Sequence, residues 1–385
     1  MVKKAEIADS TPTKFDARKH FAKVIKAAKL EDAACAADGI PVNDITGFID
    51  TGSYAFNGLI SGSIYKGLPN NKVLGLGGEQ ATGKTYFAIS ILGFWLTANP
   101  TGLVYYFETE GAVTSEMLIE RLGEEQASRI LVIPINTVQE FKNQGSLILD
   151  EYKNTPKENR YPYFFVLDSL GMLSTTKEMS DAINENPVQD MTRAKEVKAA
   201  FRLLTRAASR FGVPMIVTNH VYAQIGSTSH TKSHGGGSGL LYAASIIADL
   251  SKRKDKDTAD EHVGNIIHVK QSKGRLTKEG SMIDCKLSFT KGLSRHYYLI
   301  DILLATGKIT KVGNKYQWPG IPDKTFFETT IYKDPERFFT KEVLDMCDAA
   351  CGELFNYGTD LPDDSKSNAE ALEELTSGVE NDATV

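Results

Sequence analysis

The sequence predicts an α/β fold with a mostly parallel sheet, an N-terminal helical segment, a small C-terminal α/β region and an acidic tail. Three observations predict the sheet: apolar strands alternate with helices over residues 72–220, a glycine-rich turn separates the first of these strands from its helix, and polar residues cluster where strands end. Strands that are apolar throughout are typical of a parallel sheet covered by helices on both faces. Ligands bind beyond the carboxyl ends of such strands, so we expect the site there.

The elements are expected in a regular order. Helices are predicted over residues 15–40, 85–100, 137–154 and 188–212, and strands over residues 72–78, 102–111, 129–136, 162–169 and 213–220. After residue 240, three strands joined by short polar turns suggest that the sheet continues with antiparallel strands. Residues 297–320 read as a helix, a glycine turn and a hairpin, and residues 338–358 as a last helix.

Composition excludes some classes of protein. The 385 residues carry a net charge of −5 and four scattered cysteines, without a CxxC pair, which fits a reducing cytoplasm. The longest apolar run, residues 87–96, is about half of what a membrane span needs. We therefore expect a cytoplasmic protein with no membrane partner.

The glycine-rich turn has the spacing of a phosphate-binding loop. In "GGEQATGKT", Gly78, Gly83, Lys84 and Thr85 match GxxxxGK[ST] between a strand and a helix. Glycines let backbone N–H groups converge on phosphates, Lys84 would reach the β- and γ-phosphates, and the Thr85 hydroxyl would hold Mg²⁺. ATP and Mg²⁺ are the expected ligands. The residues expected to contact the nucleotide are Gly78, Glu79, Gln80, Ala81, Thr82, Gly83, Lys84, Thr85 and Tyr86.

Carboxylates end two of the neighbouring strands. Asp168 ends the strand over 162–169, where a carboxylate on the Mg²⁺ side belongs in this class. Glu108 and Glu110 follow the strand after the phosphate-loop helix, and one of them should hold the attacking water and accept its proton. We choose Glu110, the one nearer the loop; the alternative is that both are solvated carboxylates at a strand end.

Two polar segments follow strand ends. His220 ends the strand over 213–220, and the Ser-, Thr- and Gly-rich residues 221–239 come next; residues 174–189 follow the Asp168 strand. Both segments, beside a basic helix, suggest a path for nucleic acid, although the basic residues could equally be a solvated helix face. The expected DNA-contacting residues are Lys177, Arg193, Lys195, Arg202, Lys232, His234, Gly235 and Gly236.

At this point the sequence resembles a known family. The order of phosphate loop, "FETEG", "VLDSLG", "DMTRAK", "TNH", glycine loop and "KGR" is similar to the RecA-type strand-exchange recombinases, especially their bacteriophage UvsX branch. The resemblance implies an ATP-dependent recombinase that forms helical filaments on single-stranded DNA, hydrolyses ATP, and catalyses homologous pairing and strand exchange. Glu110 would be the catalytic carboxylate and His220 the γ-phosphate sensor, where many bacterial relatives carry glutamine. Lys273 and Arg275 would reach the nucleotide of the neighbouring subunit.

The same resemblance implies a division of the chain and a set of partners. Residues 1–44 would be an N-terminal helical oligomerisation segment, 45–296 a RecA-like ATPase core, 297–358 a small C-terminal region and 359–385 an acidic disordered tail. Expected partners are single- and double-stranded DNA, further copies of the chain, a single-strand-binding protein and a recombination mediator. The location would be the cytoplasm, or the host cytoplasm for a bacteriophage protein. The residue that stacks on adenine is not assigned, although Met117 or Leu118 falls near its place.

Two alternatives share the phosphate loop. A helicase-type motor on a RecA core would need an extra domain for ring formation, and no segment is large enough for one. A regulatory ATPase without a DNA partner would leave the basic helix and the two polar segments without a role.

Overall fold

The computed structural model describes residues 16–30, 33–40, 44–184, 192–223, 232–234, 239–256 and 261–358, with backbone alone at 222–223, 232–234 and 322. The chain divides into two compact units, residues 1–45 and 46–385. The acidic segment 359–385, as well as Gly235 and Gly236, lies outside the described residues.

The N-terminal unit contains α1 (Ala17–Ala28) and the 3₁₀-helix η1 (Ala36–Asp38). Helix α1 starts where the Asp16 carboxylate accepts a hydrogen bond from the Lys19 N–H, and it ends at Lys29, which is in the left-handed conformation. The helix predicted over 15–40 is therefore too long. Phe21 and Val24 remain exposed, so α1 has an apolar side.

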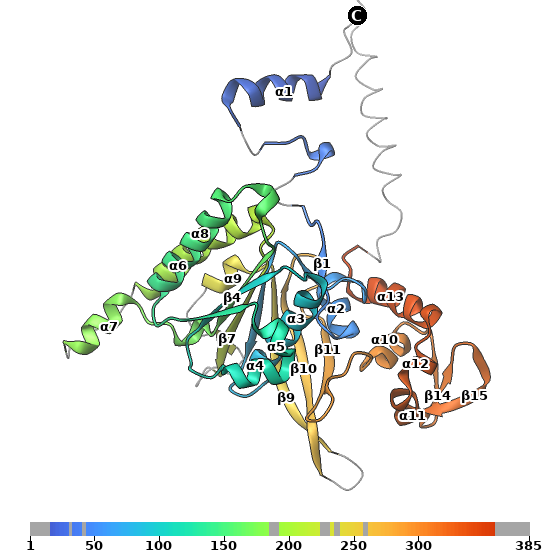
Figure 1. The fold of residues 1–385 in the computed structure, drawn as a ribbon. Coiled ribbons are helices and arrows are strands. Elements are labelled where there is room, and N and C mark those ends of the chain that lie inside the picture. The colour runs from blue at the N-terminus through green and yellow to red at the C-terminus, as the bar shows by residue number, and fades with distance from the viewer. Residues whose placement is uncertain are drawn as a thin grey trace, which may run out of the picture. The chain divides into compact units, whose positions relative to one another are not determined.

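The described part of the second unit is organised around a ten-stranded sheet (Figure 1). Strands β9, β3, β7, β6, β4 and β5 are parallel neighbours, whereas β10 and β11 are antiparallel, as predicted for the segment after residue 240. Hairpin strand β8 (Lys232–His234) pairs back onto β7, so the segment after His220 begins as a hairpin. In sheet order the other strands are β12 (Gly292–Leu293), β11 (Met282–Ser288), β10 (His262–Gly274), β9 (Ile246–Lys256), β3 (Val73–Gly78), β7 (Met215–Ala223), β6 (Tyr163–Asp168), β4 (Leu103–Glu108) and β5 (Ile130–Pro134).

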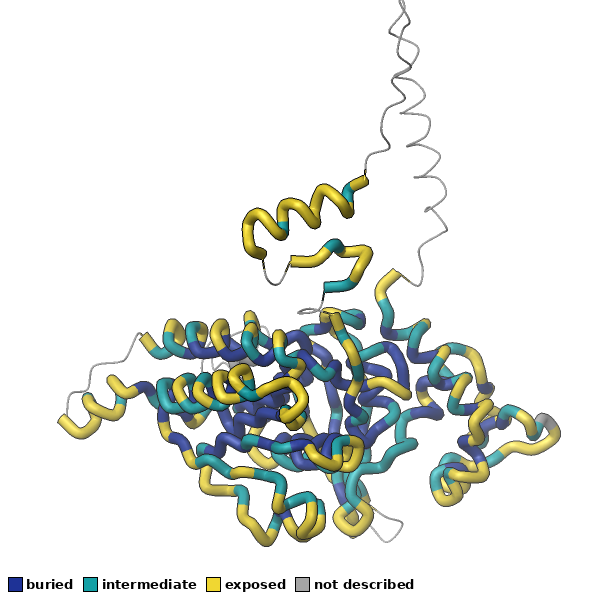
Figure 2. Tube along the Cα trace, turned by 45° about the horizontal axis from the view of Figure 1, so that its top comes forward, coloured by how far each residue is buried: buried dark blue, intermediate teal, exposed yellow. Residues whose placement is uncertain are grey.

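Helices cover both faces of the sheet, as the sequence predicts. Along β6, Phe164 and Val166 belong to a core shared with α3, whereas Phe165 and Leu167 belong to a core shared with α6 and α8. The alternation follows from the pleat, which points successive side chains to opposite faces, and Figure 2 shows the buried residues between the helical layers. The helices of this region are α2 (Tyr54–Ser61), α3 (Lys84–Ala98), α4 (Ser115–Leu122), α5 (Glu124–Ala127), α6 (Val138–Asn154), α7 (Thr176–Ile183), α8 (Arg193–Phe211) and α9 (Gly239–Ala243), with 3₁₀ turns η2 (Lys157–Asn159) and η3 (Leu170–Met172).

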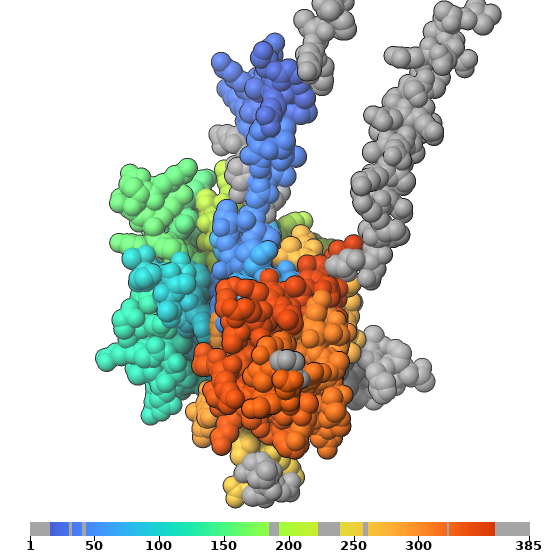
Figure 3. Space-filling view, turned by 90° about the vertical axis from the view of Figure 1, so that its right-hand side faces the viewer, coloured from blue at the N-terminus to red at the C-terminus, as the bar shows by residue number. Residues whose placement is uncertain are grey.

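The C-terminal elements form the orange and red face turned toward the viewer in Figure 3. Their aromatic residues Trp318, Phe338 and Phe339 pack edge-to-face and join the same core as α3, so residues 297–358 belong to the second compact unit. A separate C-terminal region stays a prediction. Its elements are α10 (Leu299–Ala305), β13 (Thr310–Val312), β14 (Lys315–Trp318), β15 (Ile321–Phe327), α11 (Glu328–Lys333), α12 (Pro335–Phe338) and α13 (Lys341–Phe355); β1 (Phe48–Ile49) and β2 (Leu68–Pro69) form a small separate pair.

Several local features differ from the prediction. The polar segment 174–189 contains α7, whose Thr175 and Glu178 form a capping box. Strand β15 and helices α11 and α12 were not anticipated, because their short mixed pattern has neither a clear helical nor a strand period. No helix in the described ranges is both long and apolar enough to cross a membrane.

Candidate nucleotide site

The phosphate-binding loop lies between β3 and α3, at the carboxyl edge of the parallel strands. A Cβ on Gly78 would come within 2.6 Å of the Thr82 hydroxyl oxygen and 2.9 Å of the Leu250 carbonyl oxygen, so this position needs glycine. Gly83 caps α3 with φ +97°, which glycine adopts without strain. Glu79, Gln80 and Ala81 form the exposed crest of the loop. The loop backbone is thus shaped as a cradle at a helix N-terminus, which suits phosphate.

Lys84 is folded over this loop. Its ammonium donates hydrogen bonds to the carbonyls of Gly78 (3.0 Å) and Glu79 (2.8 Å), and the residue is 7% exposed. Burial lowers the pKa of Lys84 below its ordinary value, and the negative charges of Glu110 and Asp168 oppose that effect. The ammonium is therefore held at the loop by groups that phosphate oxygens can replace.

Thr85 and Asp168 meet as the sequence predicts. The Thr85 hydroxyl donates to a carboxylate oxygen of Asp168 at 2.8 Å, and the buried Tyr106 hydroxyl donates to the same oxygen at 2.6 Å. Thr218 on β7 donates to the other oxygen. A hydroxyl that donates one hydrogen bond keeps lone pairs for a cation, so Thr85 can face Mg²⁺ while it still donates to Asp168.

The donor set fits Mg²⁺ rather than a metal held entirely by the protein. Among the described residues, no three histidine, cysteine or carboxylate side chains gather at one point. Mg²⁺ is commonly held by one or two protein oxygens together with phosphates and water. Because the hydroxyls of Thr85, Tyr106 and Thr218 already donate to Asp168, its carboxylate is placed to orient Thr85.

Glu108 and Glu110, the two alternatives for the base, have different environments. The Glu108 carboxylate accepts hydrogen bonds from the N–H groups of Glu110 (3.1 Å), Gly111 (2.9 Å) and Ala112 (2.9 Å), so it holds the turn after β4. Glu110 instead points to the end of the neighbouring strands. This arrangement favours Glu110 as the candidate base, because the turn after β4 sends the two side chains to different places.

Glu110 is held by two donors. Its Oε1 accepts a hydrogen bond from the Ser169 hydroxyl at 2.5 Å and lies 2.9 Å from His220 Nε2. Burial alone would raise the pKa of Glu110, but the hydrogen bonds from Ser169 and His220 outweigh burial and leave the pKa below its ordinary value. The carboxylate is therefore ionised near neutral pH.

The sheet register brings these side chains together. His220 lies beside Gly78 on β3, and Asp168 lies beside Glu108 on β4. The strand ends thus collect the loop, the carboxylates and the histidine at one edge. Sequence reasoning missed Ser169, Tyr106 and Thr218; the available signals were a serine directly after Asp168 and hydroxyl residues inside otherwise apolar strands.

Lys273 and Arg275 lie near the amino ends of the parallel strands, at the opposite end of the strands from the phosphate loop. Gly274 is level with Ile246 on β9 and hence with Leu74 on β3, four residues before Gly78. At ~3.3 Å per residue along the strand and ~4.8 Å between strands, about 16 Å separates Gly274 from the loop. Burial and the nearby Arg275 lower the pKa of Lys273, whose ammonium donates to the Leu241 carbonyl. Neither cation belongs to the phosphate site of its own chain.

The residues predicted to contact DNA differ in whether their side chains are already bonded within the chain. Lys177 pairs with Asp181 on α7, and the Arg193 guanidinium donates to the carbonyls of Gly171 (3.0 Å) and Leu173 (2.8 Å), so both are engaged within the chain. Lys195 and Arg202 are exposed on α8. For Lys232 and His234 the structure describes only the β8 backbone.

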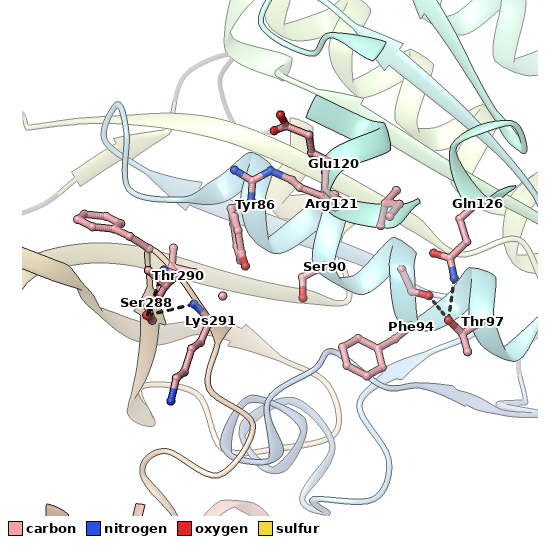
Figure 4. A pocket seen from close by; sticks show the side chains of 16 residues that line it. Tyr86, Ser90, Phe94, Thr97, Glu120, Arg121, Gln126, Ser288, Thr290 and Lys291 are labelled. Carbon is pink, nitrogen blue, oxygen red and sulfur yellow. Dashed lines mark hydrogen bonds between the residues drawn. The ribbon is translucent and has the colours of Figure 1, made fainter. Parts of the chain in front are cut away.

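A cleft of about 910 Å³ begins beside the phosphate loop at Tyr86 and continues between α3, α4 and the β11–β12 turn (Figure 4). The Arg121 guanidinium lies over the Tyr86 ring, 4.5 Å from its centroid. Of the two residues near the expected adenine position, Leu118 is buried and Met117 is half-buried. Tyr86 is therefore the aromatic side chain that lines this cleft next to the loop.

The fold and the site define a nucleotide-binding protein of the P-loop α/β class. The sequence profile of the RecA N-terminal domain matches residues 42–294, which is more than half of the chain. The chain therefore belongs to the RecA family.

Individual relatives agree with this assignment. The chain is 29% identical over 260 residues to the recombination and repair protein of Enterobacteria phage T4, covering 68% of this chain and 63% of the phage protein. It is 24% identical over 281 residues to protein RecA of Bifidobacterium breve, covering 73% of this chain and 67% of that protein. The match thus spans less than two thirds of the phage relative's length.

Proposed function

We propose that this chain is an ATP-dependent DNA recombinase that assembles as helical filaments on single-stranded DNA and pairs it with homologous duplex. One observation carries the proposal: Glu110, the candidate base, lies 2.9 Å from His220, and the chain continues from His220 into the segment expected to bind DNA. The contact between Glu110 and His220 would then couple the nucleotide-bound state of the site to the conformation of that segment. Family membership and the printed names of the relatives support this reading.

ATP binding would use the residues of the loop. Backbone N–H groups over 78–85 would surround the phosphates, with Lys84 exchanging its two carbonyl partners for phosphate oxygens. Thr85 would hold Mg²⁺, which would supply positive charge to the phosphates. The cleft lined by Tyr86 is the candidate site for the base.

Hydrolysis requires Glu110 to leave its resting partners. Ser169 and His220 both contact Oε1 of Glu110. A water at the γ-phosphate would replace them and donate its hydrogen bond to that oxygen. Glu110 then accepts the water proton as the water oxygen bonds to phosphorus and ADP leaves with its bond electrons. His220, released from Glu110, would sense the γ-phosphate. Single-stranded DNA bound to residues 221–239 would shift the same equilibrium, in which Glu110 exchanges Ser169 and His220 for the water.

Filament formation would complete the site with Lys273 and Arg275 from a neighbouring subunit. Their distance from their own loop supports this, because a head-to-tail contact brings one edge of a subunit to the opposite edge of the next. The exposed apolar side of α1 supports an oligomerisation role for residues 1–44. DNA would contact α8 through Lys195 and the two polar segments. We also propose a single-strand-binding protein and a mediator as partners, and a cytoplasmic location, the host's if the chain comes from a phage.

The test measures ATP hydrolysis with and without single-stranded DNA, together with negative-stain imaging of the same samples. A recombinase gives DNA-stimulated hydrolysis and filaments on the DNA, and Glu110→Gln abolishes the first while keeping the second. Closed rings would instead identify a helicase-type motor. An ATP hydrolysis rate that DNA does not change, with neither filaments nor rings, would identify a regulatory ATPase.

A further inference from the structure

A short turn lies beside the candidate base. This turn, η3 (Leu170–Met172), directly follows Ser169, whose hydroxyl donates to Glu110. Its glycine lies against the other partner of Glu110, because a Cβ on Gly171 would come within 3.3 Å of a ring carbon of His220. The turn is therefore next to both groups that hold the carboxylate.

The hydrogen bonds within η3 are long. The Met172 N–H donates to the Ser169 carbonyl at 3.4 Å and the Leu173 N–H to the Leu170 carbonyl at 3.3 Å, whereas most bonds of this type measure ~2.9–3.0 Å. The start of the turn is anchored by Thr109, whose hydroxyl oxygen accepts a hydrogen bond from the Ser169 N–H at 2.8 Å. Groups outside the turn therefore contribute much of what fixes its shape.

Arg193 anchors the other end of the turn. Its guanidinium donates to the carbonyls of Gly171 at 3.0 Å and Leu173 at 2.8 Å. Hydrogen bonds from a charged donor are roughly twice as strong as neutral ones. Arg193 is also the first residue of α8, where the helix dipole disfavours positive charge. The two carbonyls offset this cost and hold the guanidinium against η3.

The same contact joins the two sides of a polar segment. Residues 174–189, which are expected to bind DNA, begin directly after Leu173, and Arg193 follows them by a few positions. Arg193 thus connects the chain that leaves this segment with the turn beside Glu110. This connection is separate from the one that runs through His220.

We propose that Arg193 is a positioning residue, which holds η3 so that the Ser169 hydroxyl stays directed at Glu110. The proposal rests on the role of base proposed above for Glu110. When Arg193 leaves the two carbonyls, the turn loosens and Ser169 donates to Glu110 less often. A movement of the segment 174–189 then reaches the candidate base through Arg193.

The charge of Glu110 reports on this arrangement. Burial raises the pKa of Glu110, and the hydrogen bond from Ser169 is the first of the contacts that lower it. The titratable groups that also interact with Glu110 are His220, Lys84 and Tyr106. A change at Arg193 leaves these groups in the protein, so a weaker bond from Ser169 should raise the pKa of Glu110.

The first test follows the Glu110 carboxyl carbon by NMR in the full-length protein, labelled with ¹³C at its glutamate carboxyls and assigned with Glu110→Gln. In Arg193→Met, which keeps an apolar stem but has no donor, the titration midpoint should move to higher pH. Ser169→Ala should move it in the same direction. The combined variant should show less than the sum of the two shifts, because both changes act on one hydrogen bond. Additive shifts, or an unmoved midpoint in Arg193→Met, would overturn the proposal.

The second test measures amide hydrogen exchange in peptides that cover residues 169–174. Arg193→Met should raise exchange there roughly tenfold, as expected when hydrogen bonds from a charged donor are lost. The matched control is Arg210→Gln, which removes an exposed arginine from the same helix about 25 Å away and should leave this exchange unchanged. Unchanged exchange in Arg193→Met, or an increase spread over α8 and β6, would show that Arg193 has no specific effect on the turn.

Neither measurement needs ATP turnover. A parent protein that does not hydrolyse ATP would contradict the proposed function, whereas the titration and the exchange would still decide the role of Arg193. If Arg193 is a DNA contact and nothing more, Arg193→Met should lower single-strand affinity while both measurements on the DNA-free protein stay as in the parent. That result would also overturn the proposal.

Discussion

Two inactive variants of this chain should regain ATP turnover when they are mixed on single-stranded DNA. One is Glu110→Gln, which keeps Lys273 and Arg275; the other is Lys273→Ala/Arg275→Ala, which keeps Glu110. The expectation comes from the sheet register, which leaves Gly274 about 16 Å from the phosphate loop of its own chain. That gap is wider than either side chain can bridge, which supports the proposal that the two cations act on the nucleotide of a neighbour.

The size of the recovery follows from the geometry of a head-to-tail contact. A working interface needs the double variant on the carboxylate side and Glu110→Gln on the cation side. In a random equal mixture each condition is met half of the time, so about a quarter of the interfaces work and about a quarter of the parent rate returns. Phosphate release measured over a series of mixing ratios should peak at the equal mixture.

A matched control uses Glu110→Gln mixed with Lys84→Ala. Lys84 and Glu110 serve the same phosphate loop within one chain, so no arrangement of these two variants assembles a complete site. That mixture should stay inactive. If the first mixture also stays inactive while fluorescently labelled subunits show mixed filaments, the cations do not act across the interface.

Four further outcomes are expected. Lys84→Ala should lower ATP turnover a hundredfold or more, because one charge contact to the reacting phosphate is lost; near-normal turnover would remove Lys84 from the site. His220→Ala should keep ATP binding but abolish the rise in single-strand affinity that ATP causes, measured by fluorescence anisotropy with a slowly hydrolysed analogue. Lys232→Ala should weaken binding to all single-stranded sequences alike and lower the salt slope by about one or less; a sequence-dependent loss would contradict a phosphate contact. Ser169→Ala removes a hydrogen bond that lowers the pKa of Glu110, so the acid side of the pH–rate profile should move to higher pH, because the carboxylate must be ionised to accept a proton; an unmoved profile would mean that Glu110 does not set it.

The sheet and the phosphate loop could be predicted because each depends on a local pattern. An apolar strand followed by glycines at fixed spacing and an apolar helix is typical of a phosphate-binding loop. The capping box of Thr137 and Glu140 marks the start of α6 correctly. The similar box at Thr175 and Glu178 starts α7 inside a segment whose sequence predicts a polar loop, since few apolar residues follow it. A capping pair can therefore start a helix even where the hydrophobic pattern is weak.

The partners of the site residues could not be predicted, because they depend on the register between distant strands. Arg193 illustrates this: its charge predicts a phosphate contact, but its guanidinium donates to the carbonyls of Gly171 in η3 and of Leu173 just after it, twenty or more positions earlier in the chain. Arg202 belongs to the same predicted basic helix, yet it lines a pocket between α8, α9 and the start of β3 together with Arg275. Only the folded sheet brings these two arginines together.

The three N–H groups bound by Glu108 determine how Glu110 can move. Since one of them is the N–H of Glu110 itself, the backbone at this residue is fixed, and only rotation of its side chain remains. Side-chain rotations take picoseconds to nanoseconds, whereas loop movements take much longer. In the proposed mechanism, the carboxylate can therefore exchange its hydrogen-bond partners far faster than any loop can move.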